Sequence, residues 1–137
     1  MSVEPYIFFE GRAEEALEFY KSALDAEVEM MMRYSEAPDE EARRNAPADG
    51  DKIMHMSFRV AGTTILGSDG YAKGNPEFKG FGLALSTADE KQADAFFSAL
   101  SQGGTAVMPM QKTFFSPRFG MVTDKFGVRW MIMVPRS

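Results

Sequence analysis

The hydrophobic pattern of the first half of the chain changes its period several times, and each change marks an expected element. Residues 4–9 are mostly apolar and aromatic, which is typical of a strand. Helical spacing follows in the apolar residues Ala13, Ala16, Leu17, Tyr20 and Leu24. Alternation between apolar and polar residues then predicts strands at residues 27–34, 53–60 and 63–68, with a short turn at Ala61-Gly62. This half is therefore predicted to run strand, helix and three strands.

The same order of patterns restarts after a glycine-containing connector at about residues 70–80. A strand is predicted at residues 81–86. Asp89 is suited to cap the next helix, with Gln92 as the second half of a capping box. The apolar stripe of that helix consists of Ala93, Phe96, Phe97 and Leu100. Three further strands are expected at residues 105–110, 119–123 and 128–134.

The two halves match as an internal repeat. The residues Ala16, Phe19 and Tyr20 correspond to Ala93, Phe96 and Phe97, and Gly62 corresponds to Gly127. One such unit is too small to bury its own sheet face, so two are expected to pack together. We predict one α+β domain over residues 1–137, with a first module at about 1–69 and a second at about 81–137. The paired βαβββ modules would form a cup-shaped, curved mixed sheet with the helices on the outside.

Composition narrows the functional classes. Of the 137 residues, 45% are hydrophobic and 26% are charged, as in an average globular protein. No stretch offers the roughly 20 apolar residues of a membrane span, and the first residues do not resemble a secretory signal. We therefore expect a cytoplasmic protein without a membrane partner. The chain has no cysteine, which excludes disulfides, thiolate metal sites and a cysteine nucleophile.

The chain has a net negative charge, and most of it is concentrated in one segment. The net charge of −5 argues against binding to nucleic acid, whose backbone attracts basic surfaces. Most of this charge comes from residues 35–51, which hold six acids and two arginines. We expect a solvated loop there, and the alternative is an acidic docking surface.

Short motifs over nearly the whole chain resemble those of one protein family. They are Pro5-Tyr6-Ile7-Phe8-Phe9, Glu14-Glu15-Ala16-Leu17-Glu18-Phe19-Tyr20, Lys52-Ile53-Met54-His55, Gln111-Lys112-Thr113-Phe114, Phe119-Gly120-Met121-Val122-Thr123-Asp124 and Phe126-Gly127-Val128-Arg129-Trp130. In this order they resemble the PhnB-like branch of the vicinal-oxygen-chelate superfamily, also labelled 3-demethylubiquinone 3-methyltransferase-like. That superfamily includes lactoylglutathione lyases, extradiol dioxygenases and bleomycin-resistance proteins. The resemblance implies paired βαβββ modules around a cup, a small-molecule ligand and a homodimer.

The resemblance also assigns the positions that hold a divalent metal in metal-dependent relatives. These positions correspond to Pro5, Leu66, Gly82 and Met131, none of which offers a nitrogen or oxygen side-chain donor. A thioether suits Cu(I) rather than Zn, Ni or Fe. His55 is the only histidine, so two histidines and a carboxylate cannot meet within one chain. We expect no metal, and no other cofactor either, because the glycine-rich turn that binds S-adenosylmethionine in its common fold is missing.

Strand alternation predicts which side chains line the cup. The candidates for ligand binding are Arg33, His55, Ser57, Arg59, Gln111, Phe114, Arg129 and Met131, with Ile7 and Phe9 on the same face. Arginines and hydroxyls among apolar walls suit a small ligand with an anionic or polar head. The face under the helices is predicted to carry Met54, Met56, Phe58, Trp130 and Ile132. A slip of one residue would exchange the two faces of any strand.

Three functions are open on this basis. The favoured one is a metal-free small-molecule binding protein of the glyoxalase/bleomycin-resistance type. The second is an enzyme that acts on a small oxygenated metabolite with His55, as a weak catalytic candidate, and the arginines. The third is a structural or interaction module whose cup is filled by its own methionine and phenylalanine side chains. A cavity of about 300 Å³ or more would favour a ligand over the third function.

The predicted homodimer has weak support from the residues. Met30, Met32 and Tyr34 give an apolar face to a strand that is expected near a sheet edge. Sheet edges of this kind need cover.

Overall fold

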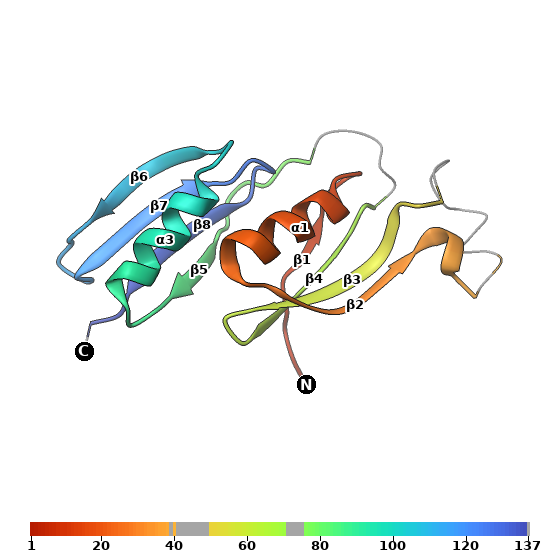
Figure 1. Ribbon diagram of the computed structural model, residues 1–137, viewed down its shortest axis with the longest axis horizontal. Coiled ribbons are helices and arrows are strands. Elements are labelled where there is room, and N and C mark those ends of the chain that lie inside the picture. Colours follow the sequence, from red (N-terminus) through yellow and green to blue (C-terminus); the bar gives the residue numbers. More distant parts are fainter. Residues whose placement is uncertain (39, 41–49, 71–75, 137) are drawn as a thin grey trace. The chain divides into compact units, whose positions relative to one another are not determined.

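The computed structural model describes residues 1–38, 40, 50–70 and 76–136, and within these residues each half of the chain forms a mixed sheet with a long helix packed on it (Figure 1). The first compact unit is Met1–Pro76 and the second is Glu77–Ser137. The acidic segment predicted at residues 35–51 lies largely outside the described residues. No helix in the described ranges has the length and apolar character needed to cross a membrane.

The first unit consists of β1 (Tyr6–Phe8), α1 (Ala13–Leu24), β2 (Glu27–Arg33), the short 3-10 helix η1 (Tyr34–Glu36), β3 (Ile53–Val60) and β4 (Thr63–Ser68). Its described strands lie in the order β1-β4-β3-β2. β1 runs parallel to β4, and the other two pairings are antiparallel.

The second unit repeats this topology. It consists of β5 (Leu83–Ser86), α3 (Glu90–Leu100), β6 (Thr105–Gln111), β7 (Arg118–Thr123) and β8 (Arg129–Val134), with the described strands in the order β5-β8-β7-β6. β5 runs parallel to β8, as β1 does to β4. The α+β class and the two βαβββ modules are therefore confirmed, whereas the cup between them stays a prediction.

The core of the first unit lies between α1 and one face of its sheet. α1 buries Ala13, Ala16, Leu17, Tyr20 and Leu24, as its helical spacing predicted. Met56 and Phe58 are fully buried, and the Phe58 ring stacks on the Tyr20 ring at a centroid distance of 5.8 Å. Met54 is only half-buried, and Ile53 is the buried residue at the start of β3.

The predicted orientation of β1 is wrong. Ile7 and Phe9 are buried at 2% and 0% exposure, and the Phe9 ring lies 6.3 Å from the Tyr20 ring of α1. Tyr6 and Phe8 are exposed instead. The reason is register, because a strand of three residues pairs with β4 from Tyr6 onward and puts alternate residues on opposite faces.

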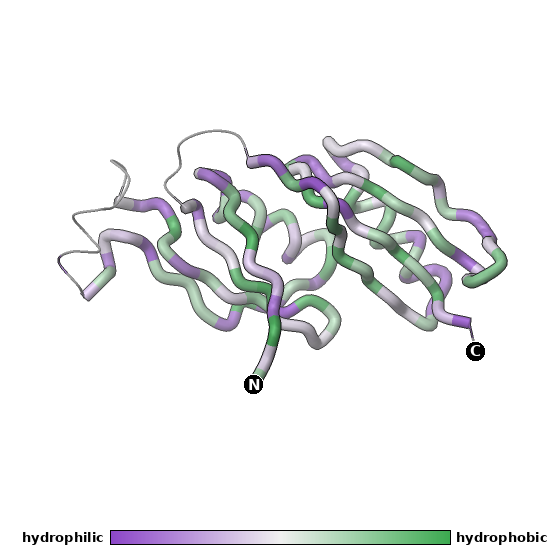
Figure 2. Tube along the Cα trace, turned by 180° about the vertical axis from the view of Figure 1, so that it is seen from behind, coloured by the Kyte–Doolittle hydropathy of each residue, from purple (hydrophilic) through white to green (hydrophobic). Residues whose placement is uncertain are grey.

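The core of the second unit lies under α3, which packs against β7 and β8. Trp130 and Ile132 of β8 are buried there, as predicted, beside Val122 of β7. In both units the hydropathy changes repeatedly along the strands, so that hydrophobic and hydrophilic residues follow one another (Figure 2). This alternation leaves each sheet with a second face that its own helix does not cover.

The helices α1 and α3 begin in different ways. Asp89 caps α3, because its Oδ1 accepts hydrogen bonds from the backbone N–H groups of Lys91 and Gln92 at 2.9 and 3.4 Å. The capping box is incomplete, since the Gln92 side chain accepts a hydrogen bond from the Thr87 hydroxyl instead. At the start of α1, Arg12 provides no side-chain cap, and the cap comes from the far end of β4.

The residue that caps α1 is Asp69, which is 1% exposed. Its Oδ1 accepts a hydrogen bond from the Ala13 N–H at 2.7 Å, and its Oδ2 accepts one from the Ile53 N–H at 2.6 Å. The Asp69 N–H donates to the Ile53 carbonyl at 2.9 Å. One buried carboxylate therefore joins the helix to two strands of the first sheet.

Candidate functional site

Three of the predicted site residues lie on the face of the first sheet that is turned away from α1. His55, Ser57 and Arg59 alternate along β3 with the buried residues Met56 and Phe58. The sheet register therefore brings them to one face, as predicted.

His55 has an aromatic neighbour on this face. It is half-buried, and its ring lies 5.8 Å from the ring of Tyr6. Arg59 is exposed, and its Nη2 donates to the Gly62 carbonyl at 3.2 Å. The catalytic role of His55 stays a prediction.

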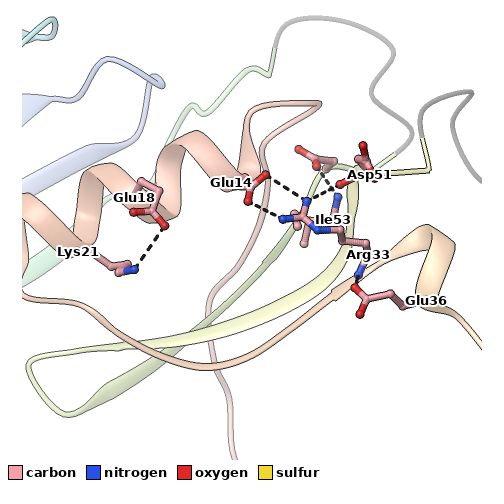
Figure 3. A network of polar contacts seen from close by, with 8 residues as sticks. Glu14, Glu18, Lys21, Arg33, Glu36, Asp51 and Ile53 are labelled. Atoms are coloured by element: carbon pink, nitrogen blue, oxygen red, sulfur yellow. Dashed lines mark hydrogen bonds and ion pairs between the residues drawn. The ribbon is translucent and has the colours of Figure 1, made fainter.

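Arg33 lies on the opposite side, so its predicted place beside His55 is wrong. Its guanidinium donates to both carboxylate oxygens of Glu14 on α1, at 3.1 and 2.6 Å, and to the Asp51 carbonyl at 2.7 Å (Figure 3). A register shift between Met32 and Arg33 interrupts the alternation of β2, and it places Arg33 opposite Ile53. Sequence alternation alone does not reveal such a shift.

The pairing of Arg33 with Glu14 changes the electrostatics at the start of α1. The hydrogen bond from Arg33 holds the pKa of Glu14 below its ordinary value, and the same bond raises the pKa of Arg33. The Glu14 side chain is 52% exposed, so the pair is of the surface type that contributes little stability. This arginine is engaged within the fold and does not extend the open face of β3.

The corresponding face of the second sheet carries Arg129 and Met131 of β8, as predicted. Across β7, Thr123 pairs with Arg129 and Met121 pairs with Met131. Direct partners in antiparallel strands point to the same face, so these four side chains lie together. The Nε of Arg129 donates to the Thr123 hydroxyl at 3.2 Å.

A cavity of about 430 Å³ lies on this face, entirely within the second unit. Its floor contains Met121 and Met131, and the segment that leads into β5 adds Phe78, Lys79 and Phe81. The Phe78 and Phe81 rings meet edge to face at 6.4 Å. Two cations, Lys79 and Arg129, line the cavity, and no acidic residue is among its described lining.

The side chain of Arg129 lies close to Gly82 at the cavity wall. A Cβ at Gly82 would stand 3.4 Å from Cγ of Arg129, so the stem of the arginine passes directly over this glycine. Among the described residues, no carboxylate forms an ion pair with Arg129 or Lys79. The positive charge of these two side chains is therefore open to an anion from solution.

Sequence reasoning missed Phe78, Lys79, Phe81 and Met121 as lining residues. The segment 70–80 was predicted as a connector, and residues 81–86 as a strand. The one signal was the local run Phe78-Lys79-Gly80-Phe81, in which a cation stands between two aromatic residues of a glycine-containing segment. Only the fold shows that this run covers the ends of β7 and β8.

Gln111 and Phe114 do not line the cavity of Arg129. Gln111 is exposed at the end of β6, and the Phe114 side chain is 88% exposed. Phe114 instead borders a separate, open cavity of about 890 Å³, together with Lys112, Glu90 and Arg136. The Phe114 carbonyl accepts a hydrogen bond from Arg136 at 3.0 Å.

The positions that correspond to metal ligands do not fit a divalent metal. Pro5 and Leu66 are adjacent in the first sheet, where the Leu66 N–H donates to the Pro5 carbonyl at 2.9 Å. Their partners by repeat, Gly82 and Met131, provide one thioether and no nitrogen or oxygen donor. Within the described residues, no group of three histidine, aspartate or glutamate side chains is arranged to hold a metal ion.

Comparison with known proteins places this fold. A family model described as 3-demethylubiquinone-9 3-methyltransferase matches residues 1–133. The protein YjdN of Escherichia coli K12 is 34% identical over 100% of this chain and 97% of its own.

Solved structures agree with the family match. The chain resembles protein PA1353 from Pseudomonas aeruginosa, with a TM-score of 0.85 and 33% identity over 100% of this chain and 99% of that one. It also resembles a putative 3-demethylubiquinone-9 3-methyltransferase, PhnB protein, from Bacillus cereus, with a TM-score of 0.81 and 32% identity over 98% and 99% of the two chains. The chain therefore belongs to the 3-demethylubiquinone-9 3-methyltransferase family, which includes this PhnB protein.

Proposed function

We propose that this protein is a metal-free small-molecule binding protein whose ligand has an apolar body and an anionic head. The observation that carries the proposal is the cavity of about 430 Å³ on the open face of the second sheet. Its volume falls in the range of small-molecule sites, which are mostly apolar with a few polar groups. The third function considered above is a structural or interaction module whose cup is filled by its own side chains. An open cavity of this volume favours a ligand over that function.

The lining divides into two parts with different chemistry. Phe78, Phe81, Met121 and Met131 form an apolar wall, and methionine adapts its shape to varied ligands. Arg129 and Lys79 supply positive charge at the same cavity. A guanidinium can hold a carboxylate, sulfonate or phosphate by two parallel hydrogen bonds.

The expected contribution of Arg129 is modest because its side chain is exposed. A hydrogen bond to a charged group is worth roughly 1.5–3 kcal/mol when it is shielded from water. An exposed ion pair contributes at most about 1 kcal/mol, which is close to a fivefold change in affinity. We expect Arg129 to contribute at most about 1 kcal/mol to the binding free energy. A larger contribution is expected only where the bound ligand excludes water from the guanidinium.

The family description names a methyl transfer, and we do not extend the proposal to that reaction. The usual S-adenosylmethionine site lies at a glycine-rich turn in a parallel sheet. In the described part of this chain, each sheet has one parallel pair and is otherwise antiparallel.

The proposal can be tested with two matched fluorescent probes. One is 8-anilinonaphthalene-1-sulfonate, and the other is N-phenyl-1-naphthylamine, which has a similar body without the sulfonate. Arg129→Ala should weaken binding of the sulfonate about fivefold and leave the neutral probe unchanged. Lys91→Ala, which removes an exposed cation from α3, is the matched control and should change neither affinity. Equal sulfonate affinity of Arg129→Ala and the unaltered protein would overturn the proposal.

We also infer a homodimer, and the inference rests chiefly on the family. β2 is an edge strand of the described first sheet, and Val28, Met30 and Met31 on it are exposed. Two register shifts in β2 make its edge a poor template for continuing the sheet, so the contact should use side chains rather than strand pairing. Sedimentation equilibrium at micromolar concentration should give about twice the chain mass of 15.2 kDa. A species at the mass of one chain would refute the dimer.

A further inference from the structure

Two methionines that are direct partners on neighbouring strands line the cavity in the second unit. Met121 of β7 and Met131 of β8 are direct partners in the antiparallel register, and both line the cavity. Both residues are half-buried, so neither is closed off from solution as the fully buried Met56 is. Arg129 lies two residues from Met131 on the same strand and therefore on the same face.

Thioethers of this kind react with hydroperoxides. In the reaction with hydrogen peroxide, a sulfur lone pair attacks one peroxide oxygen, the O–O bond breaks and an S–O bond forms. The sulfur loses two electrons, the departing oxygen takes them up and leaves as water after proton transfer, and methionine becomes its sulfoxide. The side chain thereby changes from apolar to polar, and the reaction is reversed by methionine sulfoxide reductases.

We propose that Met121 and Met131 form a redox-sensitive pair, and that their oxidation by a hydroperoxide switches off ligand binding in this cavity. This inference rests on the proposed function. Oxidation makes the floor of the cavity polar, and each new sulfoxide oxygen needs a hydrogen-bond donor when it is taken out of water.

Two cations that line the same cavity, Arg129 and Lys79, carry such donors. The Nε of Arg129 is bonded to the Thr123 hydroxyl, and Arg129 lines the same cavity with further guanidinium N–H groups. A sulfoxide that accepts from these groups competes with the anionic head of the ligand for the same donors. Oxidation therefore weakens both parts of the binding site at once.

The rest of the chain offers internal controls. Met56 is fully buried in the first unit and is protected from the oxidant. Met30 and Met31 on β2 are 40% and 37% exposed, so they react as well, but they belong to the first unit and do not line the cavity. A binding change caused by oxidation must therefore be assigned residue by residue.

The experiment treats the protein with hydrogen peroxide, maps each sulfoxide by peptide mass spectrometry and measures the affinity for 8-anilinonaphthalene-1-sulfonate. Oxidation of Met121 and Met131 should lower the affinity at least about fivefold, and methionine sulfoxide reductase should restore it. The variant Met121→Leu/Met131→Leu cannot form a sulfoxide at either position, so its affinity for the probe, measured before and after treatment, should not change with peroxide. The control Met30→Leu/Met31→Leu should lose affinity as the unaltered protein does.

Three outcomes overturn the inference. The first is complete oxidation of Met121 and Met131 with unchanged probe affinity, measured on the unaltered protein and thus independent of how the variants fold. The second is the absence of sulfoxide at both positions when Met30 and Met31 are fully oxidised. The third is a loss of probe affinity after peroxide treatment that is as large in Met121→Leu/Met131→Leu as in the unaltered protein. Failure of the untreated protein to bind the probe would instead refute the proposed function.

Discussion

Replacement of Asp69 by alanine should destabilise the protein more than the loss of any ordinary helix cap. The Asp69 carboxylate is 1% exposed and accepts two short hydrogen bonds, from the N–H groups of Ala13 and Ile53. Ala13 and Ile53 are themselves buried at 0% exposure, so water does not replace the lost acceptor. The substitution therefore leaves two buried donors without partners, one at the first residue of α1 and one at the start of β3.

The expected magnitude follows from these two bonds. A hydrogen bond to a charged acceptor is worth about 1.5–3 kcal/mol, so two of them together give about 3–5 kcal/mol after partial relaxation. Asp69→Asn keeps one acceptor oxygen but turns an amide N–H₂ toward the second donor, and it should cost about half as much. By contrast, Asp89 is an exposed local cap of α3, and Asp89→Ala should cost about 1 kcal/mol.

Urea unfolding followed by far-ultraviolet circular dichroism provides the measurement. With a slope of about 2 kcal/mol per M, Asp69→Ala should lower the midpoint by about 2 M and Asp89→Ala by about 0.5 M. Hydrogen exchange of the α1 peptide should also accelerate in Asp69→Ala, because the first turn of the helix loses its anchor. If Asp69→Ala and Asp89→Ala shift the urea midpoint equally, the Asp69 carboxylate does not stabilise the junction between α1 and the strands of the first sheet more than an ordinary cap does.

Two further predictions concern single side chains. Glu14→Gln should remove a small part of the free energy of unfolding that depends on pH. The hydrogen bond from Arg33 lowers the pKa of Glu14 in the folded protein. This contribution is therefore present above the ordinary glutamate pKa and is lost as the pH falls through the lowered pKa of the folded protein. Urea midpoints measured from neutral to acidic pH check this, with Glu18→Gln as the exposed control, and the same pH dependence in both variants would contradict it. Gly104→Ala should cost about 1–3 kcal/mol, because a Cβ there would overlap the carbonyl oxygen of Thr123 and the backbone cannot yield as a side chain does. A melting temperature unchanged from that of the unaltered protein would show that this turn tolerates the methyl group.

The element order was predictable because it depends on local periodicity. The stripe of α1, the cap of α3 at Asp89 and the alternation along β8 all follow from contacts within a few residues. The internal repeat then fixed the topology, since two matching patterns must form matching units. Trp130 was placed under the helix correctly for the same reason, because β8 is regular along its described length.

The errors have a common physical origin in register and long-range contacts. β1 is too short for alternation to show its phase, and only its pairing with β4 turns Ile7 and Phe9 toward α1. A register shift in β2 moves Arg33 away from His55, and a shift leaves no mark in the hydrophobic pattern. The cap of α1 comes from Asp69, 56 residues further along the chain.

The sequence by itself determined the elements and, by repeating their order in the two halves, the internal repeat. Each of these depends on residue identity or on spacing within one element. The tertiary structure decided which face each irregular strand presents, which arginine remains open to an anion and how the run Phe78-Lys79-Gly80-Phe81 encloses a cavity over β7 and β8. These features depend on strand pairing and on contacts between distant segments, because the free energy of burial is minimised over the whole unit rather than over any one stretch of it.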